Sequence, residues 1–185
     1  MSVSKFSVVA LGGIAALLIA AGEGELSAPD GVVSPTGEIS LPDDFRGRYV
    51  HLGSWFVPDG EASGFHDVYA NPEAVRGYRK TGQFPDGTVL VKELRSATSG
   101  TYTTGQNVRR ANDHLKQWFV MVKDSKDRFS GDPRWGNGWG WALFPGDAPA
   151  KNAATDFRKD CLGCHAPAAA QDWIYVEAYP TLRPR

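Results

Sequence analysis

The sequence is poor in sulfur, with two cysteines and two methionines among 185 residues. The cysteines, Cys161 and Cys164, stand together, so no structural disulfide competes for them. Net charge is also small: 20 basic residues oppose 21 acidic ones, giving −1 and a pI near 6.4. This balance argues against nucleic acid or an anionic membrane as the main partner. No internal repeat is visible, which excludes a solenoid or propeller.

The two cysteines belong to the motif Cys161-Leu162-Gly163-Cys164-His165. Cys-x-x-Cys-His is the attachment signature of a c-type haem. In this interpretation the thiols of Cys161 and Cys164 add to the haem vinyl groups, and His165 ligates the iron. On one helical turn, positions i, i+3 and i+4 share a face, so all three side chains can address one porphyrin.

Two other interpretations of the motif are open. A Cys-x-x-Cys pair can be half of a zinc site, which here would draw its further ligands from the remaining histidines, His51, His66 and His114. It can also be a thioredoxin-like redox pair, but that motif needs a βαβ context, which the C-terminal position does not supply. The adjacent His165 favours haem.

The N-terminus favours export. Residues 1–22 have the pattern of a secretory signal, with Lys5 ahead of an uncharged apolar run and small residues before Glu23. The run is shorter than the about 20 residues of a membrane-spanning helix, although an uncleaved anchor is an alternative. We therefore expect a periplasmic protein with a cleaved signal peptide, a flexible leader over residues 23–40 and one haem domain over residues 41–185.

The haem domain should be mainly β (α+β), an antiparallel sheet with a few short helices around one haem. Aromatic and β-branched runs predict strands at residues 49–57, 65–70, 88–94, 117–123, 138–144 and 173–179. A helix is expected from Pro72 to Lys80, with Asn71 as N-cap and Gly82 at its end. A second helix should carry residues 152–165.

The methionines bear on the sixth iron ligand. Helical electron-carrier cytochromes place the haem motif early and a ligating methionine after it. Here the motif is late and no methionine follows it, while Met121 lies in an apolar strand run that suggests core packing. An open sixth position is therefore expected, and open haem sites bind or transform small molecules.

Lys92 stands out on the predicted strand 88–94. Leu90, Lys92 and Leu94 share one face of the strand, while Val91 and Glu93 share the other. Both faces carry apolar residues, so Lys92 or Glu93 should lie beside buried surface, where an unpaired charge is costly. By pattern alone Lys92 could simply snorkel or pair with a carboxylate.

The blocks around Lys92 resemble the cytochrome P-460 family. They are Tyr78-Arg79-Lys80-Thr81-Gly82, Phe84-Pro85-Asp86-Gly87-Thr88-Val89-Leu90-Val91-Lys92-Glu93-Leu94, Val122-Lys123-Asp124-Ser125-Lys126, the late haem motif and Tyr179-Pro180-Thr181-Leu182-Arg183. The resemblance runs from about Leu41 to Arg183. It implies a mainly antiparallel β fold shared with cytochrome c′-beta, and usually a homodimer.

The resemblance implies that Lys92 forms a covalent bond to a meso carbon of the haem. Family members with this cross-link oxidise hydroxylamine, releasing nitrous oxide or a nitric oxide-level product, and pass electrons to an acceptor such as a small cytochrome c. The alternative is a cytochrome c′-beta-like protein without the cross-link, which binds nitric oxide or carbon monoxide without turnover. A simple electron carrier is a third possibility, which the missing downstream methionine disfavours.

The distal side departs from the family pattern. Members place an arginine two residues before the Val-Tyr of the distal strand, and here His66 takes that place, ahead of Val68. A histidine there suits proton relay near neutral pH, but it could also ligate iron or be an ordinary core residue. Phe65 is a candidate for the distal wall. Asp67 and Asp156 are weak candidates for a relay carboxylate.

Overall fold

The computed structural model describes Met1, residues 28–29 and residues 31–183. Its centre is a sheet with the order β1-β2-β3-β4-β6-β5, in which all pairs are antiparallel. The strands are β1 (Val50–Val57), β2 (Gly64–Ala70), β3 (Val89–Tyr102), β4 (Gly105–Lys123), β5 (Trp135–Gly136) and β6 (Trp139–Pro145). The helices are α1 (Phe45–Arg48), α2 (Pro72–Thr81), α3 (Phe157–Asp160), α4 (Leu162–His165), and the 3₁₀ turns η1 (Ala166–Gln171), η2 (Val176–Ala178) and η3 (Pro180–Leu182). The predicted mainly β fold is confirmed.

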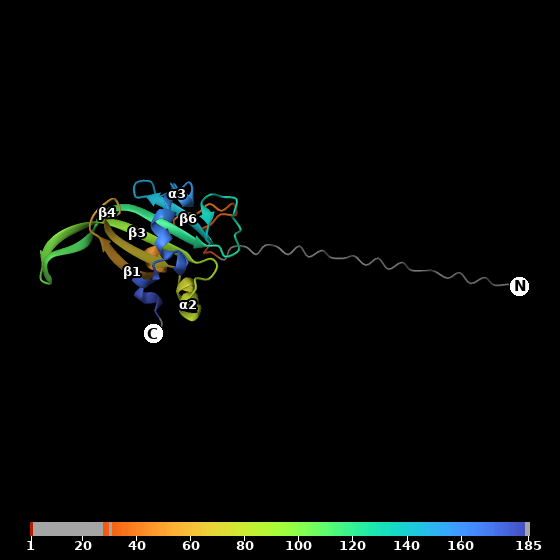
Figure 1. Ribbon diagram of the computed structural model, residues 1–185, viewed down its shortest axis with the longest axis horizontal. Coiled ribbons are helices and arrows are strands. Elements are labelled where there is room, and N and C mark those ends of the chain that lie inside the picture. The colour runs from red at the N-terminus through yellow and green to blue at the C-terminus, as the bar shows by residue number, and fades with distance from the viewer. Residues whose placement is uncertain (2–27, 30, 184–185) are drawn as a thin grey trace.

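The sheet buries both of its faces, so it has two apolar cores. Alternation along β3 sends Leu90 and Lys92 to one face and Val89, Val91 and Glu93 to the other. The Leu90 face packs against the C-terminal segment that carries the haem motif, which crosses the front of the sheet in Figure 1. The opposite face packs against the N-terminal segment and α1. We call these the motif face and the leader face.

The helix α2 matches its sequence signals with one exception. Pro72 opens it and Gly82 ends it in the left-handed conformation, at φ 75°. Asn71 precedes it, but its side chain makes no capping bond; Oδ1 instead accepts from the backbone N–H of Val89 at 2.9 Å. Asn71 therefore ties the helix start to β3 rather than capping the helix.

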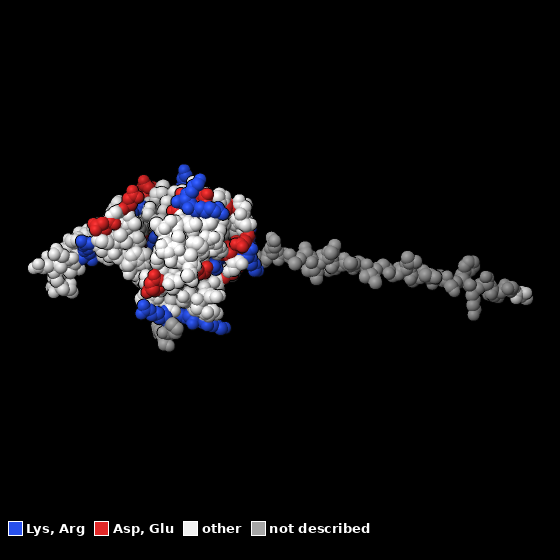
Figure 2. Space-filling model, in the orientation of Figure 1, with Lys and Arg blue, Asp and Glu red and all other residues white. Residues whose placement is uncertain are grey.

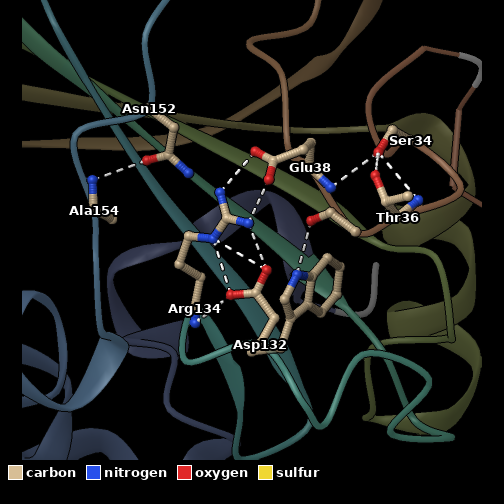
Figure 3. Close-up of polar contacts among 9 residues, drawn as sticks. Ser34, Thr36, Glu38, Asp132, Arg134, Asn152 and Ala154 are labelled. Atoms are coloured by element: carbon tan, nitrogen blue, oxygen red, sulfur yellow. Dashed lines mark hydrogen bonds and ion pairs between the residues drawn. The ribbon is translucent and has the colours of Figure 1, made fainter.

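The segment before Leu41 is packed, which corrects the predicted leader boundary. Val32 and Ile39 are buried on the leader face, and Gly37 accepts a hydrogen bond from Trp135 Nε1 at 2.9 Å. Figure 3 shows Arg134 between Glu38 and Asp132, donating to both carboxylates. The folded domain thus begins by Val32. The predicted signal peptide, residues 1–22, lies outside the described residues apart from Met1.

β3 and β4 continue well past the predicted strands as a two-stranded arm, which projects from the body in Figure 1. The register shifts between Leu94 and Ala97, where the arm leaves the sheet. Beyond this bulge the arm is largely exposed, with Tyr102 near its tip at 44% exposure. Its polar sequence carries no apolar alternation, which is why the strand pattern ended at Leu94.

The predicted last strand, residues 173–179, is wrong. This segment contains the 3₁₀ turn η2 and lies between η1 and η3, and its residues Ile174 and Tyr179 are buried against the motif face. The segment has the β-branched and aromatic residues that are typical of a strand. Here these residues pack individually into the core, and the segment is not part of the sheet. Within the described residues no helix is long and apolar enough to cross a membrane.

Candidate haem-binding site

The haem motif spans two short helices instead of the single helix expected for residues 152–165. α3 ends at Asp160 and α4 begins at Leu162, with Cys161 between them at φ −127°. The backbone N–H of Cys161 donates to Phe157 O at 3.0 Å, and that of Cys164 donates to Cys161 O at 3.2 Å. Despite the break, Cys164 and His165 lie in α4 and Cys161 directly precedes it, so the three residues remain within about one helical turn.

Asp156 caps this stretch. Its carboxylate accepts from the backbone N–H of Arg158 at 3.0 Å, and it stands at the N-cap of α3. This hydrogen bond satisfies one of the free donors at a helix start. Asp156 therefore supports the start of the motif helix, and its polar contacts are with Arg158 rather than with His66 or Lys92.

We expect Asp156→Ala to destabilise the protein by about 1 kcal/mol, the usual cost of losing an N-cap. Asp156→Ser should recover most of this loss because a hydroxyl can accept the same bond from Arg158. Urea unfolding of the two variants and the parent measures the difference. Equal midpoints for the alanine variant and the parent would contradict the capping role.

His165 is oriented by a hydrogen bond from one ring nitrogen. Its Nδ1 lies 2.7 Å from the carbonyl oxygen of Trp173, and its ring meets the Trp141 ring edge-on at 4.9 Å. A carbonyl can only accept, so Nδ1 carries the proton and Nε2 keeps its lone pair. Burial lowers the pKa of His165 and favours the neutral ring. A neutral histidine held in this way suits ligation of haem iron through Nε2.

The two cysteines are free thiols in different surroundings. Cys161 packs against the motif-face core, and burial raises its pKa to about 12, while Cys164 is exposed. The hydroxyl of Tyr175 donates to Cys164 O at 2.6 Å, so the segment that holds His165 through Trp173 also holds the end of α4. The donor set, two free thiols beside one oriented imidazole, fits a c-type haem. The described residues contain no cluster of three or more His, Cys, Asp or Glu that could hold a metal ion.

Lys92 lies on the motif face, on the side of the sheet that the haem motif covers. Its cross-strand partners are Val68 on β2 and Phe119 on β4, and its Nζ sits 4.1 Å from the centre of the Phe119 ring. Burial lowers the pKa of Lys92 to about 8, and electrostatic attraction to Cys164 and Cys161 opposes this shift. The amine thus interacts electrostatically with both cysteines, and it loses its proton at a lower pH than an ordinary lysine does.

Glu93, the other charged residue of the pattern, is buried on the leader face. It accepts hydrogen bonds from Arg46, from Arg95 at 2.6 Å and from Trp118 Nε1 at 3.0 Å. Burial alone would raise the pKa of Glu93, but these three donors lower it. Glu93 is therefore paired with two cations, whereas the amine of Lys92 rests on the Phe119 ring and pairs with no carboxylate of the described residues.

His66 shares the motif face with Lys92. It neighbours Val68, the partner of Lys92, along β2, and its ring stacks on Trp55 at 5.2 Å with an angle of 18°. Nε2 lies 2.7 Å from Ala62 O, so Nε2 carries the proton. Nδ1 is buried and has no hydrogen-bond partner among the described residues. Burial lowers the pKa of His66, so a neutral imidazole with a free lone pair is held beside Lys92.

Phe65 and Asp67 lie on the opposite face of β2 from His66. Because side chains alternate along a strand, the neighbours of His66 point to the leader face. Phe65 packs on Phe56 at 5.0 Å, and Asp67 accepts from Ser54 and lies 3.2 Å from His51 Nε2. The structure thus separates these two candidates from Lys92 and His66.

Three aromatic residues that the sequence did not single out complete the site. Trp55 orients His66, Phe119 holds the Lys92 amine, and Trp173 supplies the carbonyl for His165. Trp55 and Phe119 could have been found once the strand register was known, because Trp55 pairs with His66 and Phe119 pairs with Lys92. Trp173 could not have been found in this way, since its contribution is a backbone oxygen.

A cavity of about 670 Å³ adjoins the loop beside His165. Its walls include Tyr78, Phe84, Lys123, Asp172 and Val176, and neither Lys92 nor His66 lines it. It therefore adjoins residues 170–172 and 176 and is separate from the residues around Lys92.

The fold and the site together define a class of protein: a mainly antiparallel β domain with a c-type haem motif seated against one face of its sheet. The family model described as Cytochrome P460 matches residues 42–176. The match covers most of the chain, so the chain belongs to the cytochrome P460 family and is a haem protein of that family. No curated protein matches it.

Proposed function

We propose that this protein is a periplasmic c-type haem enzyme that oxidises hydroxylamine at a haem cross-linked through Lys92. The observation that carries the proposal is the half-buried amine of Lys92, which lies over the Phe119 ring on the motif face and has a pKa that desolvation lowers to about 8. In such a family member, Cys161 and Cys164 would bind the haem covalently and His165 would ligate its iron. The bound haem supplies the redox chemistry and the site where the substrate nitrogen binds.

The lowered pKa suits Lys92 to bond formation. A lysine reacts as a nucleophile in its neutral form, and desolvation makes that form accessible near neutral pH. Joining Nζ to a meso carbon removes one N–H and one C–H hydrogen, so two electrons and two protons pass to an oxidant such as a peroxide during maturation. Phe119 holds Nζ in place before the bond forms.

His66 is suited to accept a proton. Hydroxylamine must lose protons as it is oxidised, and a base whose pKa lies below neutrality is ready to take one at neutral pH. Ala62 holds the proton on Nε2 and leaves Nδ1 as the acceptor, while Trp55 fixes the ring plane. A histidine thus takes over, in this chain, the place of the family's distal arginine.

The electrons must leave to a partner, for which we propose a small redox protein such as a cytochrome c. Figure 2 shows a face whose centre carries few charged side chains, with acidic and basic side chains around its rim. The exposed residues Ala166, Pro167, Ala169 and Ala170 of η1 follow the haem motif directly. We also propose export through residues 1–22 and a homodimer, both as features that the family resemblance and the sequence pattern support.

The direct test is turnover by the purified, exported protein with hydroxylamine and an artificial electron acceptor. The proposal expects acceptor reduction that depends on hydroxylamine, with nitrous oxide or a nitric oxide-level product in the headspace. Haem-loaded protein that reduces no acceptor would exclude the enzyme.

Non-enzymatic binding of nitric oxide or carbon monoxide is the second candidate. The observation in its favour is the cation–π contact of Lys92 with Phe119, which stabilises the protonated amine without a covalent bond to haem. In that case Lys92 would remain a free amine and the haem spectrum would be that of ordinary haem c.

His66→Gln is expected to lower the rate of hydroxylamine oxidation by about 10²- to 10⁴-fold, the usual contribution of a positioned base. Glutamine can still donate to Ala62 but cannot accept a proton. In the parent, the rate should fall as pH drops through a pKa below the about 6.5 of a free imidazole, because burial lowers the pKa of His66.

The matched control is His114→Gln, which changes an exposed histidine that bonds Ser96 on the arm. Stopped-flow or steady-state rates across pH for the parent and the two variants provide the comparison. Equal rates and pH profiles for parent and His66→Gln would remove His66 from the mechanism.

A further inference from the structure

The loop that holds His165 has an unfavourable backbone. Asp172 and Trp173 both lie in the left-handed region, at φ 57° and φ 67°. Aspartate tolerates this conformation, but a bulky residue such as tryptophan rarely adopts it. Such a conformation persists when surrounding contacts fix it, and it is often found at functional sites.

Two donors from neighbouring strands fix Asp172. Lys123 Nζ lies 2.7 Å and 2.9 Å from its two carboxylate oxygens, and Trp139 Nε1 lies 3.1 Å from its backbone oxygen. Lys123 ends β4 and pairs directly with Trp139 at the start of β6. The Lys123 side chain is 13% exposed and its amine lies 4.8 Å from the centre of the Trp139 ring. The loop is therefore anchored to the end of β4 and the start of β6.

The anchored loop aims one backbone oxygen at the haem motif. The left-handed turn presents Trp173 O to Nδ1 of His165 at 2.7 Å. A hydrogen bond to the second nitrogen of a ligating histidine fixes its orientation and raises the basicity of the nitrogen that binds the metal. The position of Trp173 O depends in turn on Asp172, one residue earlier.

We propose that the Lys123–Asp172 ion pair is a positioning device for the axial ligand, setting the strength of the bond that His165 makes to haem iron. The pair acts through the Trp173 carbonyl and does not touch the reacting atoms. This inference rests on the proposed ligation of haem by His165 and is independent of the Lys92 cross-link and of hydroxylamine turnover.

The test uses the haem-loaded protein and two variants, Lys123→Met and Asp172→Asn. Resonance Raman of the ferrous protein gives the iron–histidine stretching frequency, and a spectroelectrochemical titration gives the reduction potential. We expect Lys123→Met to shift the stretch to lower frequency and the potential to a more positive value. Asp172→Asn should shift both in the same direction but less, because asparagine tolerates the left-handed backbone and keeps an acceptor oxygen.

Two controls separate positioning from general stability. Lys123→Arg keeps a cation near Asp172 and should return the stretch toward the parent value. Lys126→Met removes the same charge from an exposed position three residues away and should leave the stretch unchanged. Urea unfolding of all variants shows which of them are merely destabilised.

The inference is overturned if Lys123→Met and Asp172→Asn bind haem and keep the parent stretch and potential, whatever their unfolding midpoints. A parent protein that carries no haem bound through His165 would overturn this inference together with the proposed haem site. Loss of hydroxylamine oxidation alone would overturn the proposed enzyme and leave this inference standing.

Discussion

Replacing Lys92 by leucine is expected to leave covalent haem in the protein and to abolish hydroxylamine oxidation. It should also abolish the strongly red-shifted ferrous Soret band that we expect of a haem cross-linked through Lys92. Leucine removes the nucleophile but suits a site between Val68 and Phe119, so the fold should survive. The product should have the spectrum of ordinary haem c and behave as a gas-binding protein. Absorption spectra and turnover of the purified variant measure both effects.

Lys92→Arg is the matched control for charge. Arginine keeps the cation beside Phe119 but stays protonated, so it cannot form the bond. It should therefore lose the red-shifted band as completely as the leucine variant. A red-shifted Soret band in either variant would show that the band does not arise from Lys92.

The second large effect is expected from the double variant Cys161→Ser, Cys164→Ser. Serine keeps the shape of each side chain but cannot form a thioether, so haem attachment through the motif should be lost. Haem-dependent peroxidase staining after denaturing electrophoresis should fall to background. If the Lys92 bond formed without the cysteines, some haem would stay with the chain, and staining equal to the parent would contradict attachment by the motif.

Features set by short-range pattern could be predicted from the sequence. The strand from Val89 alternates apolar residues on two faces and is buried on both, as expected, and Pro72 and Gly82 bound α2 where such residues do. The haem motif was readable because its three chemical groups lie within five residues. Met121 is buried in the motif-face core, in keeping with the packing role expected for it.

Features that depend on distant residues could not be predicted. The leader boundary was misplaced because Glu38 is fixed by Arg134, 96 positions away. The segment 173–179 has strand-like residues, yet it contains the 3₁₀ turn η2, and its residues Ile174 and Tyr179 pack on the motif face instead of extending the sheet. In contrast, the separation of Phe65 and Asp67 from His66 could have been predicted from the sequence, because adjacent residues of a strand point to opposite faces of the sheet.

Peptide mapping of the haem-loaded protein tests the central claim most directly. After trypsin digestion, the account predicts one haem-containing species in which the peptide around Lys92 and the peptide with Cys161 and Cys164 are joined through the same porphyrin. Trypsin should not cleave after Lys92, and the species should be two hydrogen atoms lighter than its parts. An unmodified peptide ending at Lys92, recovered in full yield from protein with bound haem, would contradict the cross-link.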